Sequence, residues 1–179
     1  MQAQDILHFW FEELGGQQRF VKDAALDTQM RERFGTVLQA ASRGELFTWR
    51  TTPQGRLAEI IVLDQFSRNI HRDTPAAFAQ DAQALTLAQE LVASGQDYVL
   101  DPARRSFAYM PYMHSESPLI HAQAMALFAQ PGMEGTLDFE KRHKAIIDQF
   151  GRYPHRNALL GRASTPQELD FLSRPGSSF

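Results

Sequence analysis

Residues 57–72 read LAEIIVLDQFSRNIHR, and this stretch decides how the fold can be built. Its first seven residues are apolar except Glu59, so a helix over them has an apolar surface nearly all round. Such a helix belongs at the centre of a protein rather than on its surface. We therefore predict a buried central helix over residues 53–66, which ends in the polar segment that starts at Asp64.

The polar half of this stretch occurs twice in the chain. Residues 64–72 read DQFSRNIHR and residues 148–156 read DQFGRYPHR, with six of nine positions identical. Each copy follows an apolar run, so each is predicted to be the end of a helix and the loop after it. The 84-residue separation would fit two helix pairs of about 42 residues, a usual size for helical repeats, although the sequence shows no clear match at 42 itself.

Helical spacing of apolar residues extends over the rest of the chain. One helical stripe contains Met30, Phe34, Val37, Leu38 and Ala41. Pairs of Ser or Thr with Pro supply an N-cap hydroxyl and a proline at the first helical position, and no segment alternates with period two. The predicted helices span 4–14, 27–43, 53–66, 75–94, 102–109, 118–129, 137–150 and 166–173. The sequence thus predicts a single all-α domain over residues 1–179, built from antiparallel helix pairs.

Composition limits the possible classes of protein. The chain has 179 residues, 43% of them hydrophobic, and a net charge of −3, so the whole molecule has no polyanion-binding character. It contains no cysteine, which excludes disulfides, thiolate metal sites and a cysteine nucleophile. The N-terminal segment lacks a basic signal region, and no apolar run approaches the ~18 residues of a membrane span. We expect a soluble, cytoplasmic protein.

The two polar segments are rich in side chains that bind anions. Fifteen of the 18 basic residues are arginine, whose planar group pairs with carboxylate or phosphate through two hydrogen bonds. In one interpretation these arginines only brace the fold, for example through an Asp64–Arg68 ion pair. In the other, the two segments converge and their arginines face a bound anion.

A third polar segment, residues 109–117, reads YMPYMHSES. Pro111 is expected to break a helix, which would place His114 and Glu116 on non-helical backbone, where either could transfer protons. A metal site would have to use His114, Glu116 and His143, and the chain has no His-Glu-x-x-His motif. We predict no metal site. The sequence also contains no P-loop, Gly-x-Ser-x-Gly or Gly-x-Gly-x-x-Gly motif, and it points to no cofactor.

Residues 141–162 form a local basic region, with six Lys or Arg side chains against the one acid Asp148. A basic face of this kind can bind nucleic-acid phosphates. No RNA-binding signature accompanies it, and the rest of the chain is acidic, so the sequence does not favour a nucleic-acid partner.

The sequence resembles the bacterial family called domain of unknown function 924. The resemblance rests on the combination of four segments: LAEIIVLDQFSRNIHR, PAAFAQD, YMPYMHSE and FGRYPHRNALLGRASTPQE. The resemblance covers nearly the whole chain and includes ILHFWF near the N-terminus. It implies an all-α, tetratricopeptide-like or α-solenoid-like fold and no established activity. His71 departs from the family pattern, which is usually aromatic there, and Asp148 and Gln149 stand at positions that are less fixed. The positions that match the family motifs are Asp64, Gln65, Arg68, Asn69, Arg72, Asp81, His114, Glu116, His143, Arg152, His155, Arg156, Asn157 and Arg162.

Two functions are consistent with these residues. The first is a pocket for a small anionic molecule, with the possibility of an enzyme; the second is a tetratricopeptide-like scaffold that binds a protein or peptide. The candidate catalytic residues are His114, Glu116 and His155. The candidate ligand-binding residues are Asp64, Arg68, Asn69, Arg72, His143, Arg152, Arg156, Asn157 and Arg162. The sequence specifies neither a reaction nor an oligomeric state.

Overall fold

The computed structural model describes residues 1–177, and no β-strand occurs among them. The α-helices are α1 (Ala3–His8), α2 (Ala24–Ser42), α3 (Pro53–Ile61), α4 (Ser67–Ile70), α5 (Asp81–Ala93), α6 (Pro102–Met113), α7 (Pro118–Phe128), α8 (Glu134–Phe150) and α9 (Pro166–Leu172). Two π-helical turns are η1 (Phe9–Glu13) and η4 (Val62–Phe66). The 3-10 turns are η2 (Gln18–Phe20), η3 (Phe47–Thr51), η5 (Pro75–Phe78), η6 (Gln96–Val99) and η7 (Pro154–Arg156). The predicted all-α class is confirmed.

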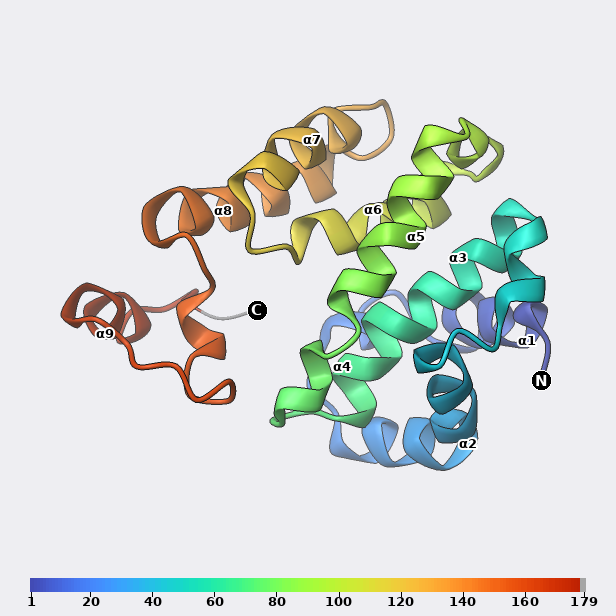
Figure 1. Cartoon of the computed structure of the whole chain (residues 1–179), viewed down its shortest axis with the longest axis horizontal. Helices are drawn as coiled ribbons and strands as arrows, with labels where there is room; N and C mark the ends of the chain where they lie inside the picture. Colours follow the sequence, from blue (N-terminus) through green and yellow to red (C-terminus); the bar gives the residue numbers. More distant parts are fainter. Residues whose placement is uncertain (178–179) are drawn as a thin grey trace.

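The helix over LAEIIVL lies at the centre of the molecule, as its composition predicts. α3 continues through η4 into α4, so residues 53–70 form one rod (Figure 1). Leu57, Ile60 and Leu63 are completely buried. Glu59 is buried as well, and both of its carboxylate oxygens accept hydrogen bonds from Arg50, at 2.7 and 2.6 Å. This pairing compensates a charge that would otherwise be costly inside the core.

The other helices pack around this rod. α1 contacts α3, and α2 contacts α4, while α5 and α6 contact α3. α6, α7 and α8 follow as successive neighbours, and α9 lies at the opposite end of the molecule from α1 (Figure 1). The main hydrophobic core extends from α1 to α7. A smaller core of Ile146, Ile147 and Tyr153 joins α8 to the C-terminal segment.

Three predicted helix boundaries are wrong. The central helix does not end at residue 66 but runs on to Ile70, because Ile70 is buried where α4 packs on α2. Pro111 lies inside α6, and the buried side chains around it keep the helix intact as far as Met113 despite the lost hydrogen bond. Residues 75–94 form two elements, η5 and α5, instead of one helix.

The predicted helix starts have mixed outcomes. Thr52 and Thr165 cap α3 and α9 through their hydroxyls, and Asp101 caps α6 through its carboxylate. Thr74 and Ser117 precede a proline as expected, but their side chains make no capping hydrogen bond. Within residues 1–177, no helix has both the length and the apolar character that crossing a membrane requires.

Candidate functional site

Asp64 is a buried carboxylate in η4, and its side chain is 1% exposed. Its Oδ1 lies 3.0 Å from Nη1 of Arg68 and 2.7 Å from Nδ1 of His114, and its Oδ2 accepts a hydrogen bond of 2.6 Å from Gln65. Burial alone would raise the pKa of Asp64, but Arg68, His114 and Gln65 together hold it well below its usual range. Asp64 is therefore ionised at neutral pH.

Asp81, at the start of α5, brings the two copies of the repeated motif together. Its Oδ2 accepts hydrogen bonds from Nη2 of Arg68 at 3.0 Å and from Nη1 of Arg156 at 3.1 Å. Both guanidinium groups lie over the ring of Phe78, at 5.7 and 4.5 Å from its centroid. Arg68 and Arg156, which are 88 residues apart in the sequence, thus share one carboxylate oxygen and one aromatic face.

The two arginines differ in how well their charges are compensated. Burial lowers the pKa of Arg68, but Asp64 and Asp81 more than offset this and raise it above its ordinary value. Burial also lowers the pKa of Arg156, and the nearby Arg68 lowers it further, against the opposing effect of Asp81. Arg156 is therefore the less compensated cation of the two.

His114 completes the group of residues around Asp64 from the C-terminal end of α6. Its backbone oxygen accepts a hydrogen bond of 3.0 Å from Nη2 of Arg156, and its side chain is 16% exposed. Burial and the charge of Arg68 lower the pKa of His114, although Asp64 opposes the shift. A neutral imidazole that donates Nδ1–H to Asp64 presents Nε2 as a proton acceptor.

Glu116 lies two residues further along and pairs with Arg162. Its Oε2 is 2.6 Å from Nη1 of Arg162, and its Oε1 accepts hydrogen bonds from Nη2 of Arg162 at 2.9 Å and from the backbone N–H of Tyr153 at 2.8 Å. Burial would raise the pKa of Glu116, but Arg162 and the Tyr153 amide lower it. This pair fixes the segment after α8 against the end of α6.

Three imidazole rings surround Tyr153. The ring centroid of Tyr153 lies 5.5 Å from that of His155, 5.8 Å from that of His143 and 6.3 Å from that of His121. Burial lowers the pKa of His143 to about 3 and, together with Arg156, that of His155 to about 4, so both are neutral at pH 7. Among the described residues, no group of three or more His, Asp or Glu side chains is arranged to hold a metal ion.

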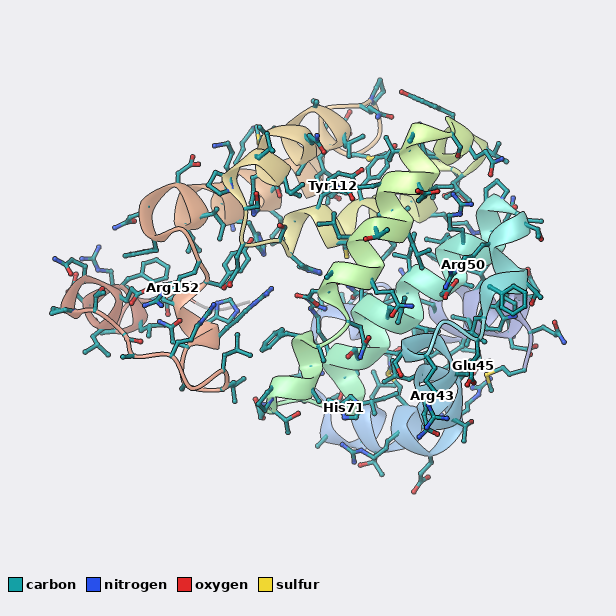
Figure 2. All side chains as sticks on the ribbon, in the orientation of Figure 1. Arg43, Glu45, Arg50, His71, Tyr112 and Arg152 are labelled. Carbon is teal, nitrogen blue, oxygen red and sulfur yellow. The ribbon has the colours of Figure 1, made fainter. Side chains whose placement is uncertain are left out.

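Other candidate ligand-binding residues form separate ion pairs. Arg72 donates to both oxygens of Asp27 at 2.5 and 2.8 Å, and Asn69 donates to the same carboxylate at 2.8 Å. Arg152 donates to both oxygens of Glu168 at 2.6 and 2.8 Å, and it lies beside α9 in Figure 2. These arginines bind α2 and α9 rather than Asp81.

The two motif copies therefore have different local structures, contrary to the prediction that each is a helix end followed by a loop. Ser67, at the fourth motif position, has α-helical backbone angles, so the helix continues and carries Arg68 to the Asp64 face. Gly151 stands at the equivalent position with a φ of 69°, which ends α8 at once. As a result, Arg68, the fifth residue of the first copy, shares the carboxylate of Asp81 with Arg156, the ninth residue of the second copy.

Phe78 and Tyr153 are outside the set predicted from the sequence, and Asp81 is identified there only through the family resemblance. The remaining candidate, Asn157, is 1% exposed and donates a hydrogen bond of 3.0 Å to Ser164. The sequence gives no local signal for Phe78, because an aromatic residue in an apolar helix is ordinarily assigned to the core.

The fold and this group of residues define an all-α protein with a partly exposed cluster of paired charges. The chain belongs to the bacterial family of unknown function DUF924, whose family model matches residues 6–176. It is also similar to the solved structure of a protein of unknown function from Agrobacterium tumefaciens, with 37% sequence identity and a TM-score of 0.90 over 96% of each chain. No curated protein matches the chain.

Proposed function

We propose that the protein binds a small anionic molecule at the Asp64 cluster, which consists of Asp64, Arg68, Asp81, His114 and Arg156. The observation that supports this function is the sharing of Asp81 Oδ2 by the guanidinium groups of Arg68 and Arg156. Guanidinium groups held this close together supply several donors to a carboxylate or phosphate ligand. Phe78 beneath them fixes their planes and limits their hydration.

The exposed edge of the cluster indicates where the ligand enters. Side chains of Asp81 and Arg68 are 20% and 19% exposed, whereas that of Asp64 is 1% exposed. Solvent therefore reaches the edge formed by Asp81 and Arg68, although Oδ1 of Asp81 itself is buried, and Asp64 forms the buried floor. In the absence of a ligand, Asp81 supplies the negative charge that the two arginines require. A bound anion would compete with Asp81 for the same N–H donors.

His114 gives this proposal a chemical step. Asp64 accepts the Nδ1–H hydrogen bond and fixes the tautomer, so that Nε2 can take a proton from a hydroxyl group or a water molecule held beside the bound anion. The resulting imidazolium would be stabilised by the ionised Asp64. The enzyme we propose is therefore one in which His114 is the general base and Arg68 and Arg156 position the anionic substrate.

A tetratricopeptide-like scaffold is the second candidate function, and one observation favours it. Each arginine of the Asp64 cluster already contacts a carboxylate, as does Arg162 beside it. In that interpretation the cluster only braces the contact between α4, α5 and the segment after α8, and the partner is a protein or peptide bound elsewhere.

Thermal unfolding with and without anions separates the two functions. We would measure the melting temperature of the wild type, Arg156→Met and the control Arg33→Met in phosphate, in citrate and in chloride of equal ionic strength. Arg33 is a suitable control because it also pairs with a carboxylate, that of Glu13, through bonds of 2.5 and 2.8 Å, and it lies outside the Asp64 cluster. A ligand at 100 times its Kd adds ~2.7 kcal/mol, or roughly 5–11 °C for a domain of this size.

The anion-binding function predicts this rise for the wild type and Arg33→Met, and its loss in Arg156→Met. If phosphate and citrate leave the wild-type melting temperature at its chloride value, the proposal fails and the scaffold is favoured. If all three proteins respond equally, the anions bind outside the Asp64 cluster, and the proposal also fails.

A further inference from the structure

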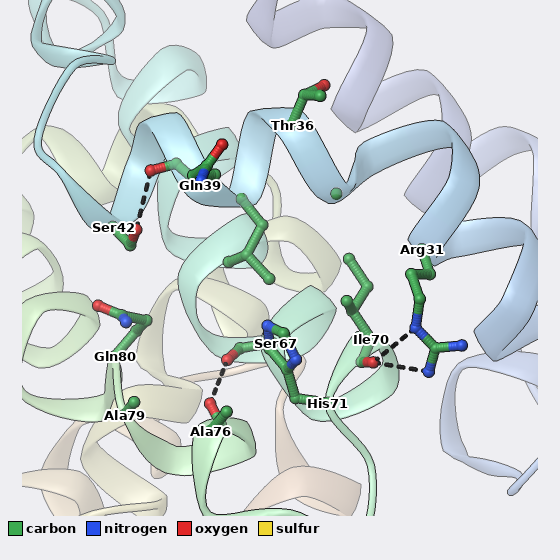
Figure 3. Close-up of a pocket in the computed structure, with 12 residues that line it drawn as sticks. Arg31, Thr36, Gln39, Ser42, Ser67, Ile70, His71, Ala76, Ala79 and Gln80 are labelled. Atoms are coloured by element: carbon green, nitrogen blue, oxygen red, sulfur yellow. Dashed lines mark hydrogen bonds between the residues drawn. The ribbon is translucent and has the colours of Figure 1, made fainter.

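A cavity of about 430 Å³ opens between α2 and the segment formed by α4 and η5 (Figure 3). Its apolar wall includes Leu38, Ile70 and Ala76, and polar side chains such as Gln39 and Gln80 stand at its rim. No residue of the Asp64 cluster lines it, and its volume lies in the range typical of small-molecule sites.

Gly35 faces this cavity from the middle of α2. A Cβ atom built on Gly35 would have no neighbour within 4 Å, so no close contact requires glycine at this position. Glycine in a helix interior is less stable than alanine or leucine, because it loses more backbone entropy on folding. Glycine at position 35 therefore lowers the stability of α2 and leaves this space unfilled.

The charge of the lining favours an anionic ligand. Arg31 and His71 are the titratable residues that line the cavity. All lining residues belong to the described part of the chain, and none of them is acidic. Arg31 donates Nε and Nη2 to the backbone oxygen of Ile70, at 3.2 and 2.8 Å, and its Nη1 takes no part in either bond (Figure 3).

Asp27 does not neutralise the charge of Arg31 fully. Arg31 lies close enough to Asp27 to interact with it electrostatically, but Asp27 already pairs with both N–H groups of Arg72. Two arginines therefore share one carboxylate beside the cavity. The hydroxyls of Ser42 and Ser67 donate to backbone oxygens, which leaves the guanidinium of Arg31 as the strongest available donor at the wall.

From the cavity, Gly35 and Arg31 together, we infer a second binding site that takes a small monocarboxylate with an apolar body. The carboxylate would accept from Arg31, and the apolar body would lie along Leu38, Ile70 and the open face of Gly35. This site is independent of the Asp64 cluster and goes beyond the function proposed for it.

The test uses hexanoate and the neutral hexanamide as probes, with binding followed by amide chemical shifts in NMR titrations of the full-length protein. We expect hexanoate to shift amides in residues 31–42 and 67–80 saturably, and hexanamide to bind at least fivefold more weakly. Gly35→Leu fills the cavity, so it should weaken hexanoate at least tenfold while the melting temperature rises by about 1–4 °C. Gly135→Leu is the control for the added side chain, because Gly135, in the first turn of α8, also has nothing within 4 Å of a built Cβ and does not line the cavity.

Each outcome decides the inference. Unchanged hexanoate affinity in Gly35→Leu, or equal binding of hexanoate and hexanamide to the wild type, overturns it. A lower melting temperature in Gly35→Leu also overturns it, because the space at Gly35 would then not be open. Arg156→Met should leave hexanoate binding here unchanged, so failure of the Asp64 cluster as an anion site would not be confused with failure of this one.

Discussion

Replacement of Asp64 by asparagine removes one charge from the floor of the Asp64 cluster. The new amide nitrogen takes the place of Oδ2, so the Gln65 amide has to turn and accept a hydrogen bond from it instead of donating one. Asparagine has nearly the same shape, and its carbonyl can still accept the hydrogen bond from Nδ1 of His114. The ion pair of 3.0 Å between Asp64 and Arg68 is lost. The variant therefore measures what the buried carboxylate contributes as an anion.

The structure sets the size of the effect. Removal of one partner from a buried ion pair costs about 3–5 kcal/mol, because the other charge stays behind in a poorly hydrated site. Arg68 is 19% exposed and keeps its contact with Asp81 at 2.9 Å, so the lower end of this range applies. We expect Asp64→Asn to lose ~3 kcal/mol of unfolding free energy, which corresponds to roughly 6–12 °C in melting temperature.

Urea unfolding at pH 7 provides the free energy, and a double-mutant cycle with Arg68→Met separates the pair from other effects. The double variant should be less destabilised than the sum of the two single variants. A loss below ~1 kcal/mol for Asp64→Asn would refute the reasoning, since surface ion pairs already contribute that much. If the free-energy losses of the two single variants add up to the loss of the double variant, Asp64 and Arg68 do not stabilise one another.

The pH dependence of the same variant has a definite sign. Asp64 has a folded-state pKa below its unfolded value of ~3.9, so its ionised form stabilises the protein above that value. The contribution is lost as the pH falls below ~3.9 towards the folded-state pKa. The stability difference between wild type and Asp64→Asn should therefore shrink as the pH falls below ~3.9. A difference that grows below this pH would contradict the assignment.

Two further predictions concern the scaffold around the site. Arg152→Met should lower the melting temperature, because it leaves Glu168 without its two-bond partner. The rise in melting temperature with phosphate should be the same as in the wild type. Loss of this rise would place Arg152 in the anion site. Gly55→Ala should lower the melting temperature by about 2–12 °C, because the new Cβ would lie 2.1 Å from the backbone oxygen of Trp49; an unchanged melting curve would show that η3 moves without cost.

Local patterns in the sequence account for much of this structure. The central position of α3 follows from the apolar composition of residues 57–63, and the stripe from Met30 to Ala41 is buried as its spacing indicates. The start of α9 follows from Thr165 and Glu168, which form a capping box. These features depend on neighbours within one or two helical turns, which a sequence shows directly.

Contacts between distant elements decide the site, and the sequence could not specify them. Arg68 and Arg72 have the same chemistry and are four residues apart, yet one pairs with Asp64 and Asp81 and the other with Asp27. Which carboxylate each arginine meets depends on how α2 and α5 pack on the central rod. Arg156 reaches Asp81 only because Gly151 ends α8 abruptly.

The most direct test of the Asp64 cluster as an anion site is calorimetric titration of phosphate into Asp81→Asn and into the wild type. Asp81 supplies the negative charge that Arg68 and Arg156 share, so its loss should destabilise the unliganded protein. The same change should strengthen phosphate binding, because phosphate no longer competes with Asp81 for the two guanidinium groups. A gain of ~1.4 kcal/mol corresponds to about tenfold in affinity. A destabilised Asp81→Asn variant that binds phosphate no better than the wild type would contradict the proposal and leave the cluster as bracing alone.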